Sequence, residues 1–547
     1  MWMCFQFVRS GSACLLVTCT ALAATACGDE DEVRAEPAWP ALPVERIPDP
    51  TDAFQPGPCP FKRPAGYAMQ CGYVEVPENR GEPNRGRLRL AVAIAYSPAT
   101  DVAKDPIVYL EGGPGGQALR SVMAESIAFE HLLVDRDLIV LDQRGAGYSL
   151  PALDCREVDQ LEADASDSDV VDALVTCRER FTQNGVDLSA YTSAHSAADV
   201  ADLRTALGYQ AWNLYGISYG SRLALTVLRD HPEGIRSVIL DGVMPLEVSP
   251  HVAHASNMQR SFDMLFDRCQ DDAVCNDAFP DLRARFFALT DRLNETEAAL
   301  EFSDGSRATF TGDDLVWLFG MLLYSAELIP ALPLLIDEVD AGDHTNLARI
   351  LPALSQTLEI NLGMYLSVTC AEELAFTTRE AVAEIEADLE PHLRAVFADP
   401  AIFDFCDAWD VPAAPPEENQ PVTSEAAALI TSGEFDPVTP PEWGHRVAKS
   451  LSHGREFTLS GESHAASLGA CGQRLVRDFL TEPDATSSLP CAARSRIIEF
   501  LEPYADVADQ RLLRGASDFV TEWESILDQQ LESSVRRIRP LPRLNER

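Results

Sequence analysis

A serine flanked by glycines, Ser218 in Gly216-Ile217-Ser218-Tyr219-Gly220, lies between an apolar run and a helical pattern. The run at 212–217 is typical of a buried strand, and residues 222–229 have helical periodicity. Gly-x-Ser-x-Gly between a strand and a helix is the pattern of a nucleophile elbow, whose turn leaves little room for side chains at the glycine positions. The pattern predicts that the Ser218 hydroxyl is a nucleophile held above a sheet edge.

A serine hydroxyl becomes a good nucleophile when an imidazole takes its proton and a carboxylate holds that imidazole in the required tautomer. Asp436 follows a strand-like run at 426–431, and His464 follows the next one, at 456–459. Both should therefore lie at the carboxyl edge of the sheet, as Ser218 should, and the order Ser, Asp, His is one that accompanies the elbow motif. We predict that these three residues form a catalytic triad.

Two other carboxylates compete for the acid position. Glu434 lies two residues before Asp436, and Asp241 ends the strand that follows the elbow. Asp436 is favoured because it follows its strand directly enough to reach His464. The other late histidines precede the last predicted strand, so His464 is the predicted base.

The intermediate of acyl transfer needs donors for its oxyanion, usually two backbone N–H groups. Tyr219 is next to the nucleophile at the start of a helix and is predicted to supply one. The loop Gly112-Gly113-Pro114-Gly115-Gly116 follows a short apolar strand and is predicted to supply the other from Gly113. Glycines suit this role because they let the backbone approach a substrate closely.

The pattern around these residues predicts an α/β fold of mostly parallel strands joined by helices. Residues 71–76 and 87–96 look like an antiparallel start to the sheet. Between about 250 and 421 helical periodicity dominates, which predicts a helical cap inserted into the sheet domain. The predicted segments are a signal peptide (1–26), a flexible tether (27–55), the first part of the core (56–249), the cap (250–421), the second part of the core (422–495) and a helical tail (496–547).

The composition is that of an acidic globular protein. The chain has 86 acidic and 43 basic residues, a formal net charge of −43, with 46% hydrophobic residues. This charge argues against nucleic acid or an anionic membrane surface as the main partner. No Cys-x-x-Cys or matching His spacing indicates a metal site, and no cofactor is implied.

The N-terminus has the features of an export signal. Arg9 precedes an apolar run at 13–23, which is shorter than the roughly 20 residues of a membrane span. Small residues then lead to Cys27 and resemble a bacterial lipobox, which would make Cys27 the lipidated first residue of the mature chain. Cleavage after Ala26 by an ordinary signal peptidase is the alternative. We expect an exported protein, either secreted or held at the cell envelope through this anchor alone.

Ten cysteines follow the signal, and an even number in an exported chain indicates disulfides. The simplest connectivity is sequential and closes short loops, although spacing alone does not fix it. The predicted pairs are Cys59–Cys71, Cys155–Cys177, Cys269–Cys275, Cys370–Cys406 and Cys471–Cys491.

Four motifs occur together in this chain. They are Gly112-Gly113-Pro114-Gly115-Gly116, Asp142-Gln143-Arg144-Gly145-x-Gly147-Tyr148-Ser149, Gly216-x-Ser218-Tyr219-Gly220 and Gly433-x-x-Asp436-Pro437-Val438-Thr439-Pro440. In combination, residues 55–495 resemble the prolyl iminopeptidase and tripeptidyl aminopeptidase family of exported α/β-hydrolases. The resemblance implies an α/β-hydrolase fold and a serine exopeptidase that releases residues from peptide N-termini. It also implies Ser218, Asp436 and His464 as the triad.

The chain departs from that family's motifs at two places. Glu111 precedes the glycine-rich loop where His or Gln is usual, and Ser463-His464-Ala465 replaces the common Gly-His-Gly. Both departures touch the edge of the predicted site and leave its substrate preference open.

An aminopeptidase must bind a free α-amine, for which a carboxylate is the natural partner. The segment 369–374 resembles the family's Cys-x-Glu stretch, so Glu372, and after it Glu373, is the candidate amine-binding residue. A solvated helix carboxylate is the alternative. The expected substrates are peptides with a free N-terminus.

Two other classes of function fit the same residues. A carboxylesterase or lipase would use the same triad and differ only in the cap. A non-catalytic surface protein that kept the fold for binding would not react with a fluorophosphonate.

Overall fold

The computed structural model describes residues 51–64, 66–124, 130–161, 165–302, 305–354, 360–483 and 498–501. The predicted signal peptide, Cys27 and most of the predicted tether and tail lie outside these ranges. Strand β1 already begins at Phe54, inside the segment predicted as a tether. Residues 498–501 of the predicted helical tail are not helical, and Leu501 donates its N–H to Pro330 O at 2.9 Å.

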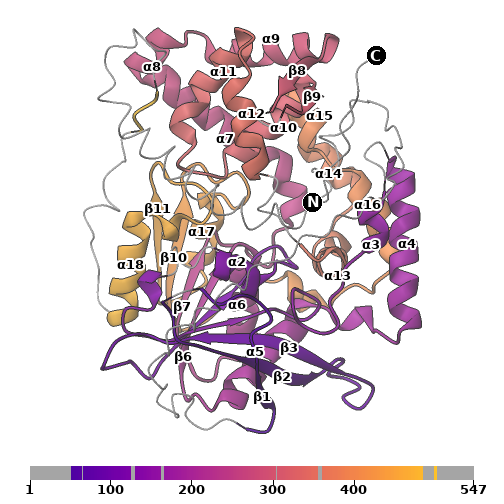
Figure 1. Cartoon of the computed structure of the whole chain (residues 1–547), viewed down its shortest axis with the longest axis vertical. Helices are drawn as coiled ribbons and strands as arrows, with labels where there is room; N and C mark the ends of the chain where they lie inside the picture. The colour runs from indigo at the N-terminus through magenta and orange to yellow at the C-terminus, as the bar shows by residue number, and fades with distance from the viewer. Residues whose placement is uncertain are drawn as a thin grey trace, which may run out of the picture.

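Among the described residues, nine strands form one sheet in the order β1-β2-β3-β5-β4-β6-β7-β10-β11 (Figure 1). The pairs from β1 to β3 and the β3–β5 pair are antiparallel. All pairs from β5 across to β11 are parallel, which confirms the predicted α/β fold. The strands are β1 (Phe54–Gly57), β2 (Met69–Pro77), β3 (Arg87–Ala95), β4 (Ile107–Leu110), β5 (Leu138–Leu141), β6 (Trp212–Ile217), β7 (Ile235–Asp241), β10 (Ala427–Gly433) and β11 (Gly454–Leu459).

Helices cover both faces of this sheet. Successive side chains of a strand point to opposite faces, so Val108 and Leu110 of β4 join the apolar cluster of α5 and α6. Ile107 and Tyr109 join the opposite cluster, with α2 and α18. The helices of this part are α2 (Ala118–Ala124), α3 (Arg156–Asp159), α4 (Asp167–Gln183), α5 (Ser193–Leu207), α6 (Tyr219–Asp230), α17 (Pro441–Ala448) and α18 (Ala470–Thr481), with the short 3-10 helices η1 (Glu130–Leu132), η2 (Leu188–Ala190) and η6 (Ala466–Leu468).

The segment between β7 and β10 is mostly helical and divides into two parts. Helices α7, α9, α10, α11, α12 and α15 share an apolar cluster of their own and form the upper lobe in Figure 1. Helices α13 and α16 instead belong to the cluster of the sheet domain. The elements are α7 (Pro250–Asp271), α8 (Ala273–Ala278), α9 (Leu282–Glu295), β8 (Ala298–Glu301), β9 (Arg307–Phe310), α10 (Gly312–Leu322), η3 (Ile329–Ala331), α11 (Leu332–Asp340), α12 (Thr345–Leu354), α13 (Leu362–Glu372), η4 (Leu374–Phe376), α14 (Arg379–Glu386), α15 (Pro391–Phe397), α16 (Ala401–Trp409) and η5 (Pro416–Asn419).

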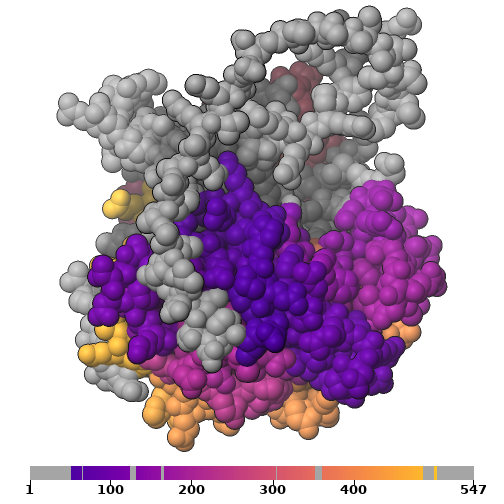
Figure 2. All heavy atoms as spheres, turned by 60° about the horizontal axis from the view of Figure 1, so that its bottom comes forward, coloured from indigo at the N-terminus to yellow at the C-terminus, as the bar shows by residue number. Residues whose placement is uncertain are grey.

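The space-filling view brings forward the side of the molecule opposite the lobe (Figure 2). The first part of the chain, coloured indigo to purple, covers much of this face. Orange and yellow residues from the C-terminal part of the chain appear along its lower and left edges. Segments from both halves of the sequence therefore share one surface, as the interleaved strand order requires.

Disulfides join the cysteines in the predicted sequential order wherever both partners are described. The bonds are Cys59–Cys71, Cys155–Cys177, Cys269–Cys275 and Cys370–Cys406. Cys471 is also disulfide-bonded, and its predicted partner Cys491 lies outside the described residues. Separately, none of the described helices combines the length and apolar character needed to cross a membrane.

Candidate active site

The chain turns sharply between β6 and α6, and Ser218 occupies the turn. Its backbone has φ 57° and ψ −126°, a region that L-residues rarely adopt and that proteins retain mainly at functional sites. A methyl group on Gly216 would lie 2.2 Å from Gly220 O, and one on Gly220 would lie 1.9 Å from Leu110 O. Both contacts are with backbone, so neither position accepts a larger residue. These features are those of a nucleophile elbow.

His464 and Asp436, 28 residues apart in the sequence, are hydrogen-bonded. The distance from His464 Nδ1 to Asp436 Oδ2 is 2.8 Å. Asp436 lies just after β10 and is fully buried, while the other side of its carboxylate accepts the N–H groups of Val438 and Thr439 at 2.9 and 2.8 Å. This arrangement fixes the carboxylate and orients the ring, so that Nε2 is the nitrogen left to accept a proton.

The pKa values of the pair shift in opposite directions. Burial raises the pKa of Asp436, but the charge and hydrogen bond of His464, together with the bonds from Thr439, bring it below its ordinary value. Burial lowers the pKa of His464, but the charge and hydrogen bond of Asp436 outweigh this and raise it. The pair therefore favours an ionised acid beside an imidazole that binds a proton more readily than usual.

The two rival acids have other partners. Glu434 forms an ion pair with Arg268 and accepts hydrogen bonds from Ser460 Oγ and Gly461 N. The carboxylate of Asp241 accepts bonds from Thr431 Oγ1 and from the N–H and hydroxyl of Ser467. Of the three carboxylates, Asp436 is the one hydrogen-bonded to His464.

The end of β7 connects the elbow to the histidine. Ser218 donates its N–H to Asp241 O at 2.9 Å, and a methyl group on the next residue, Gly242, would lie 3.3 Å from His464 Cε1. Ser218 and His464 thus flank one short piece of backbone. Within the described part of the chain no hydrogen bond joins Ser218 Oγ to His464; such bonds are often long in a free enzyme and shorten when substrate binds.

The glycine-rich loop after β4 lies against the nucleophile. A methyl group on Gly112 would be 3.2 Å from Ser218 Cβ. The N–H of Gly112 is bonded to Glu111 Oε1 at 2.9 Å, whereas that of Gly113 has no hydrogen-bond partner among the described residues. The N–H of Tyr219 is in the first turn of α6, where helix donors have no intrahelical acceptor. The N–H groups of Gly113 and Tyr219 remain the candidate oxyanion donors.

Glu111, where the resembled family usually has His or Gln, shapes this loop. Its Oε1 also accepts a bond from Tyr109 OH at 3.2 Å, and its Oε2 accepts one from the hydroxyl of Ser121. Glu111 therefore ties the start of the loop to Tyr109 and Ser121.

Two residues of the site had not been identified from the sequence. Thr439 Oγ1 lies 2.7 Å from Asp436 Oδ2 and 3.2 Å from His464 Nδ1, so it borders both members of the pair. Tyr324, just after α10, packs edge-on against the His464 ring with centroids 5.6 Å apart. Thr439 could have been found from its place in the Asp436 motif, but no local pattern marks Tyr324.

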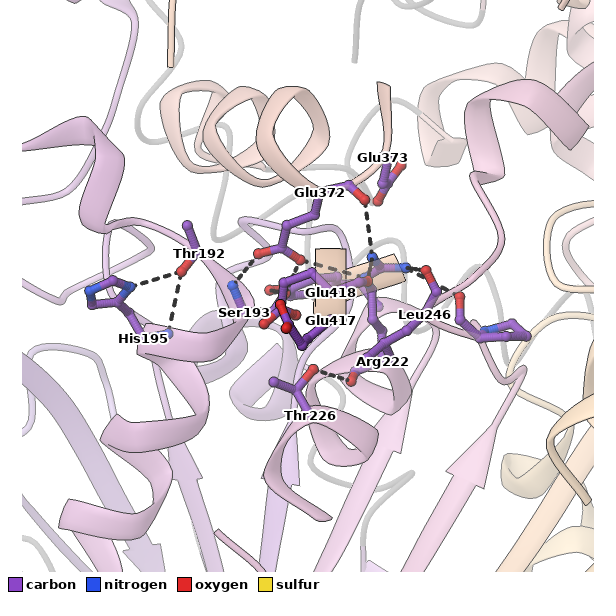
Figure 3. Close-up of polar contacts among 12 residues, drawn as sticks. Thr192, Ser193, His195, Arg222, Thr226, Leu246, Glu372, Glu373, Glu417 and Glu418 are labelled. Atoms are coloured by element: carbon purple, nitrogen blue, oxygen red, sulfur yellow. Dashed lines mark hydrogen bonds and ion pairs between the residues drawn. The ribbon is translucent and has the colours of Figure 1, made fainter. Parts of the chain in front are cut away.

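Glu372, the preferred amine-binding candidate, is occupied by the protein itself (Figure 3). Its carboxylate accepts bonds from the N–H and hydroxyl of Ser193, at the start of α5, and lies 3.6 Å from Arg222 Nε. Arg222 is fully buried on α6 and also donates to the carbonyls of Leu246 and Glu372. This carboxylate braces α5, α6 and α13 against one another, so Glu373 is the less occupied of the two candidate amine-binding residues.

Glu373 has a different environment. Figure 3 shows its side chain directed away from the group around Arg222. It is 3% exposed, and neither carboxylate oxygen has a hydrogen-bond partner among the described residues. It lines a pocket of about 390 Å³, together with Glu372, residues 247–249, 252 and 253 after β7, Phe376, and Trp443 and Arg446 of α17. Burial raises the pKa of Glu373 to about 7.

The neighbour of Glu373 on α7 does not neutralise it. His251 Nε2 lies 3.6 Å from Glu373 Oε2 and 3.2 Å from the hydroxyl of Tyr365. Burial lowers the pKa of His251 to about 3, so its ring is uncharged at neutral pH. A cation that entered the pocket would therefore give the Glu373 carboxylate the partner it lacks.

No group of three or more His, Cys, Asp or Glu side chains within the described ranges is arranged to hold a metal ion.

Comparison with known proteins agrees with this geometry. The sequence profile of the alpha/beta hydrolase fold matches residues 105–469, so the chain belongs to the α/β-hydrolase fold family. The α/β-hydrolase family that the motifs predict is therefore confirmed.

Relatives within the family differ in their described activities. The chain is 23% identical to the putative hydrolase YuaR of Escherichia coli over 456 residues, 79% of this chain and 89% of that protein. It is 30% identical to the tripeptidyl aminopeptidase of Streptomyces coelicolor over 229 residues, 38% of this chain and 42% of that protein. It is 27% identical to carboxylesterase B of Mycobacterium tuberculosis over 434 residues, 73% and 81% of the two chains. These comparisons establish a hydrolase and leave peptidase and esterase activity to be distinguished.

Proposed function

We propose that the protein is an exported serine aminopeptidase that cleaves peptides near a free N-terminus. The proposal is carried by the environment of Glu373, a buried carboxylate that has no hydrogen-bond partner among the described residues and lines a pocket. A free α-amine offers it a charge-assisted hydrogen bond that a neutral ester would not. The partial similarity to a tripeptidyl aminopeptidase supports the same class of substrate.

The mechanism follows from the placement of the side chains. Ser218 Oγ attacks the scissile carbonyl while His464 Nε2 accepts its proton, and Asp436 stabilises the imidazolium. The oxyanion accepts hydrogen bonds from Gly113 N and Tyr219 N. His464 then donates the proton to the leaving amine. In the second half of the reaction His464 Nε2 accepts a proton from water, whose oxygen attacks the acyl-enzyme, and the proton passes to Ser218 Oγ as the ester bond breaks.

Export is the second part of the proposal. Disulfides form and persist in oxidising compartments, and this chain carries them in both the sheet domain and the helical lobe. Lipidation of Cys27 belongs to the same proposal and is tested by mass spectrometry of the mature N-terminus.

A carboxylesterase is the second candidate. The similarity to carboxylesterase B extends over 73% of this chain, more than the match to the tripeptidyl aminopeptidase covers. An ester substrate would use Ser218 and His464 in the same way and would not need Glu373. The two candidates therefore differ in what they require of this one carboxylate.

A panel of peptide anilides with one to three residues, each with a free or an acetylated N-terminus, tests the proposal. We expect cleavage of free-amine substrates and a loss of about 10²-fold in kcat/KM when Glu373→Gln removes the charge. Hydrolysis of p-nitrophenyl acetate by the same variant is the control and should change little. Equal cleavage of free and acetylated peptides would refute the aminopeptidase and favour the esterase.

A further inference from the structure

The loop that carries Asp436 is attached to the helical lobe as well as to the sheet. Phe435, the residue before Asp436, is fully buried and belongs to the apolar cluster of the lobe. Its neighbour Asp436 faces His464 of the sheet domain. The orientation of the acid therefore depends on a contact with a lobe that the sequence predicts as a cap over the sheet.

Three side chains of α7 hold this loop by its backbone. Arg260 donates to the carbonyls of Glu434 and Asp436 at 2.9 and 2.6 Å. Ser261 Oγ donates to Phe435 O at 2.8 Å, and Asn257 Nδ2 donates to Val438 O at 2.8 Å. Residues spaced by three and four positions share one face of a helix, so these donors act together on one stretch of chain.

The same helix reaches the loop of the histidine through Glu434. Arg268 of α7 forms an ion pair with Glu434 Oε1, whose other oxygen accepts bonds from Ser460 Oγ and Gly461 N at 2.8 and 2.9 Å. Ser463, the residue before His464, also contacts the lobe: its hydroxyl donates to Leu323 O at the end of α10. The loops of the acid and of the base are thus both attached to the lobe.

We propose that Arg260 is a positioning residue, and that α7 holds the Asp436 loop in the geometry that lets its carboxylate orient His464. This inference rests on the proposed Ser218–His464–Asp436 chemistry but not on the choice between peptide and ester. Arg260 acts through the carbonyls on either side of Phe435 and does not touch the reacting atoms. The lobe is then part of the catalytic framework in addition to covering the site.

Arg260→Met tests this, because methionine keeps most of the side-chain volume and removes the donors. We expect kcat for p-nitrophenyl acetate to fall about 10- to 100-fold, with a smaller change in KM. The charged groups that face His464 are Asp436 and Asp241. A loosened Asp436 would stabilise the imidazolium less, so the acid limb of the kcat/KM profile should move to lower pH. Arg260→Lys, which keeps a donor, should recover part of kcat.

Arg283→Met is the matched control. Arg283 of α9 pairs with Asp263 and Asp267 of α7, and the variant removes an arginine contact to the same helix without touching the Asp436 loop. Its kcat and pH profile should stay close to those of the wild type. A comparable loss of kcat and shift of profile in this variant would indicate general loosening of the lobe and overturn the proposal.

Ser261→Ala, which removes a single hydroxyl, is measured in place of Arg260→Met if that variant does not fold, and must shift the profile in the same direction. Fluorophosphonate labelling of the wild type distinguishes a failure of the proposed serine chemistry from a failure of the proposed role of α7. An unlabelled wild type would refute the proposed serine chemistry. A labelled, active wild type whose kcat and pH profile are unchanged by these α7 substitutions would refute the role of α7 alone.

Discussion

The carboxylates of Glu372 and Glu373 enter different environments although the residues are adjacent. Glu372 is bound by Ser193 and lies 3.6 Å from Arg222, whereas Glu373 has no hydrogen-bond partner among the described residues, although both line the same pocket. Helix α13 ends at Glu372, and Glu373 follows it with φ −120° and ψ −63°, outside the helical region, so the two side chains leave the backbone in different directions.

Glu373→Gln should stabilise the free protein at alkaline pH. The pKa of Glu373 is about 7 in the fold and about 4.3 in an unfolded chain. The folded state therefore binds this proton more tightly, and the contribution of Glu373 to stability falls as pH rises from about 4 to about 7. The variant lacks this loss, so its Tm relative to the wild type should be higher at pH 8 than at pH 4. An equal Tm difference between variant and wild type at pH 4 and pH 8 would contradict a raised pKa for Glu373.

Asp436→Asn should lower kcat by about 10³- to 10⁴-fold, because the amide disturbs the tautomer of His464. Glu434→Gln and Asp241→Asn test the rival acids, and each should cost less than about tenfold because neither carboxylate is bonded to His464. Steady-state kinetics on one substrate compares all three variants. A loss with Asp241→Asn as large as that with Asp436→Asn would reassign the acid.

Activity should fall as pH decreases through the pKa of His464. The base acts in its neutral form, and Asp436 holds the pKa of His464 above its ordinary value of about 6.5. The acid limb of kcat/KM should therefore lie above pH 6.5 in the wild type. In the residual activity of Asp436→Asn the limb should move to lower pH, and a limb that stays in place would show that another group controls it.

Gly220→Ala should be strongly destabilising. The added methyl group would lie 1.9 Å from Leu110 O, and backbone cannot rotate away as a side chain can. We expect a loss of about 3 kcal/mol or more in unfolding free energy, seen as low soluble yield or a low denaturation midpoint. Gly57→Ala is a control, because that glycine has open space around its Cβ position and, like Gly220, no positive φ. Equal stability of the two variants would be inconsistent with the elbow packing.

The sequence was sufficient to predict the α/β sheet and the proximity of Asp436 and His464. Strand, turn and helix signals are local, and the carboxyl ends of parallel strands meet at one edge, so Asp436 and His464 could be placed together before any coordinates. The sequential disulfides between described cysteines were predicted for a similar reason, since each closes a short loop.

The rest depends on tertiary packing, which short motifs do not encode. The motif around Cys370 located both glutamates but could not tell which of them the protein's own side chains would bind. The hairpin β8–β9 was missed because four-residue strands carry little periodic signal. Asn257, Arg260 and Ser261 contact the Asp436 loop across about 175 positions of sequence. No local pattern in either segment predicts that they meet.

In the proposed mechanism, His464 and Asp436 make Ser218 nucleophilic. The most direct measurement is labelling of the purified protein with a fluorophosphonate, followed by mass spectrometry of its peptides, in the wild type and in Ser218→Ala and His464→Ala. We expect one label, on Ser218, absent from Ser218→Ala and formed far more slowly in His464→Ala. A label on another residue, or equal labelling of Ser218→Ala, would contradict it.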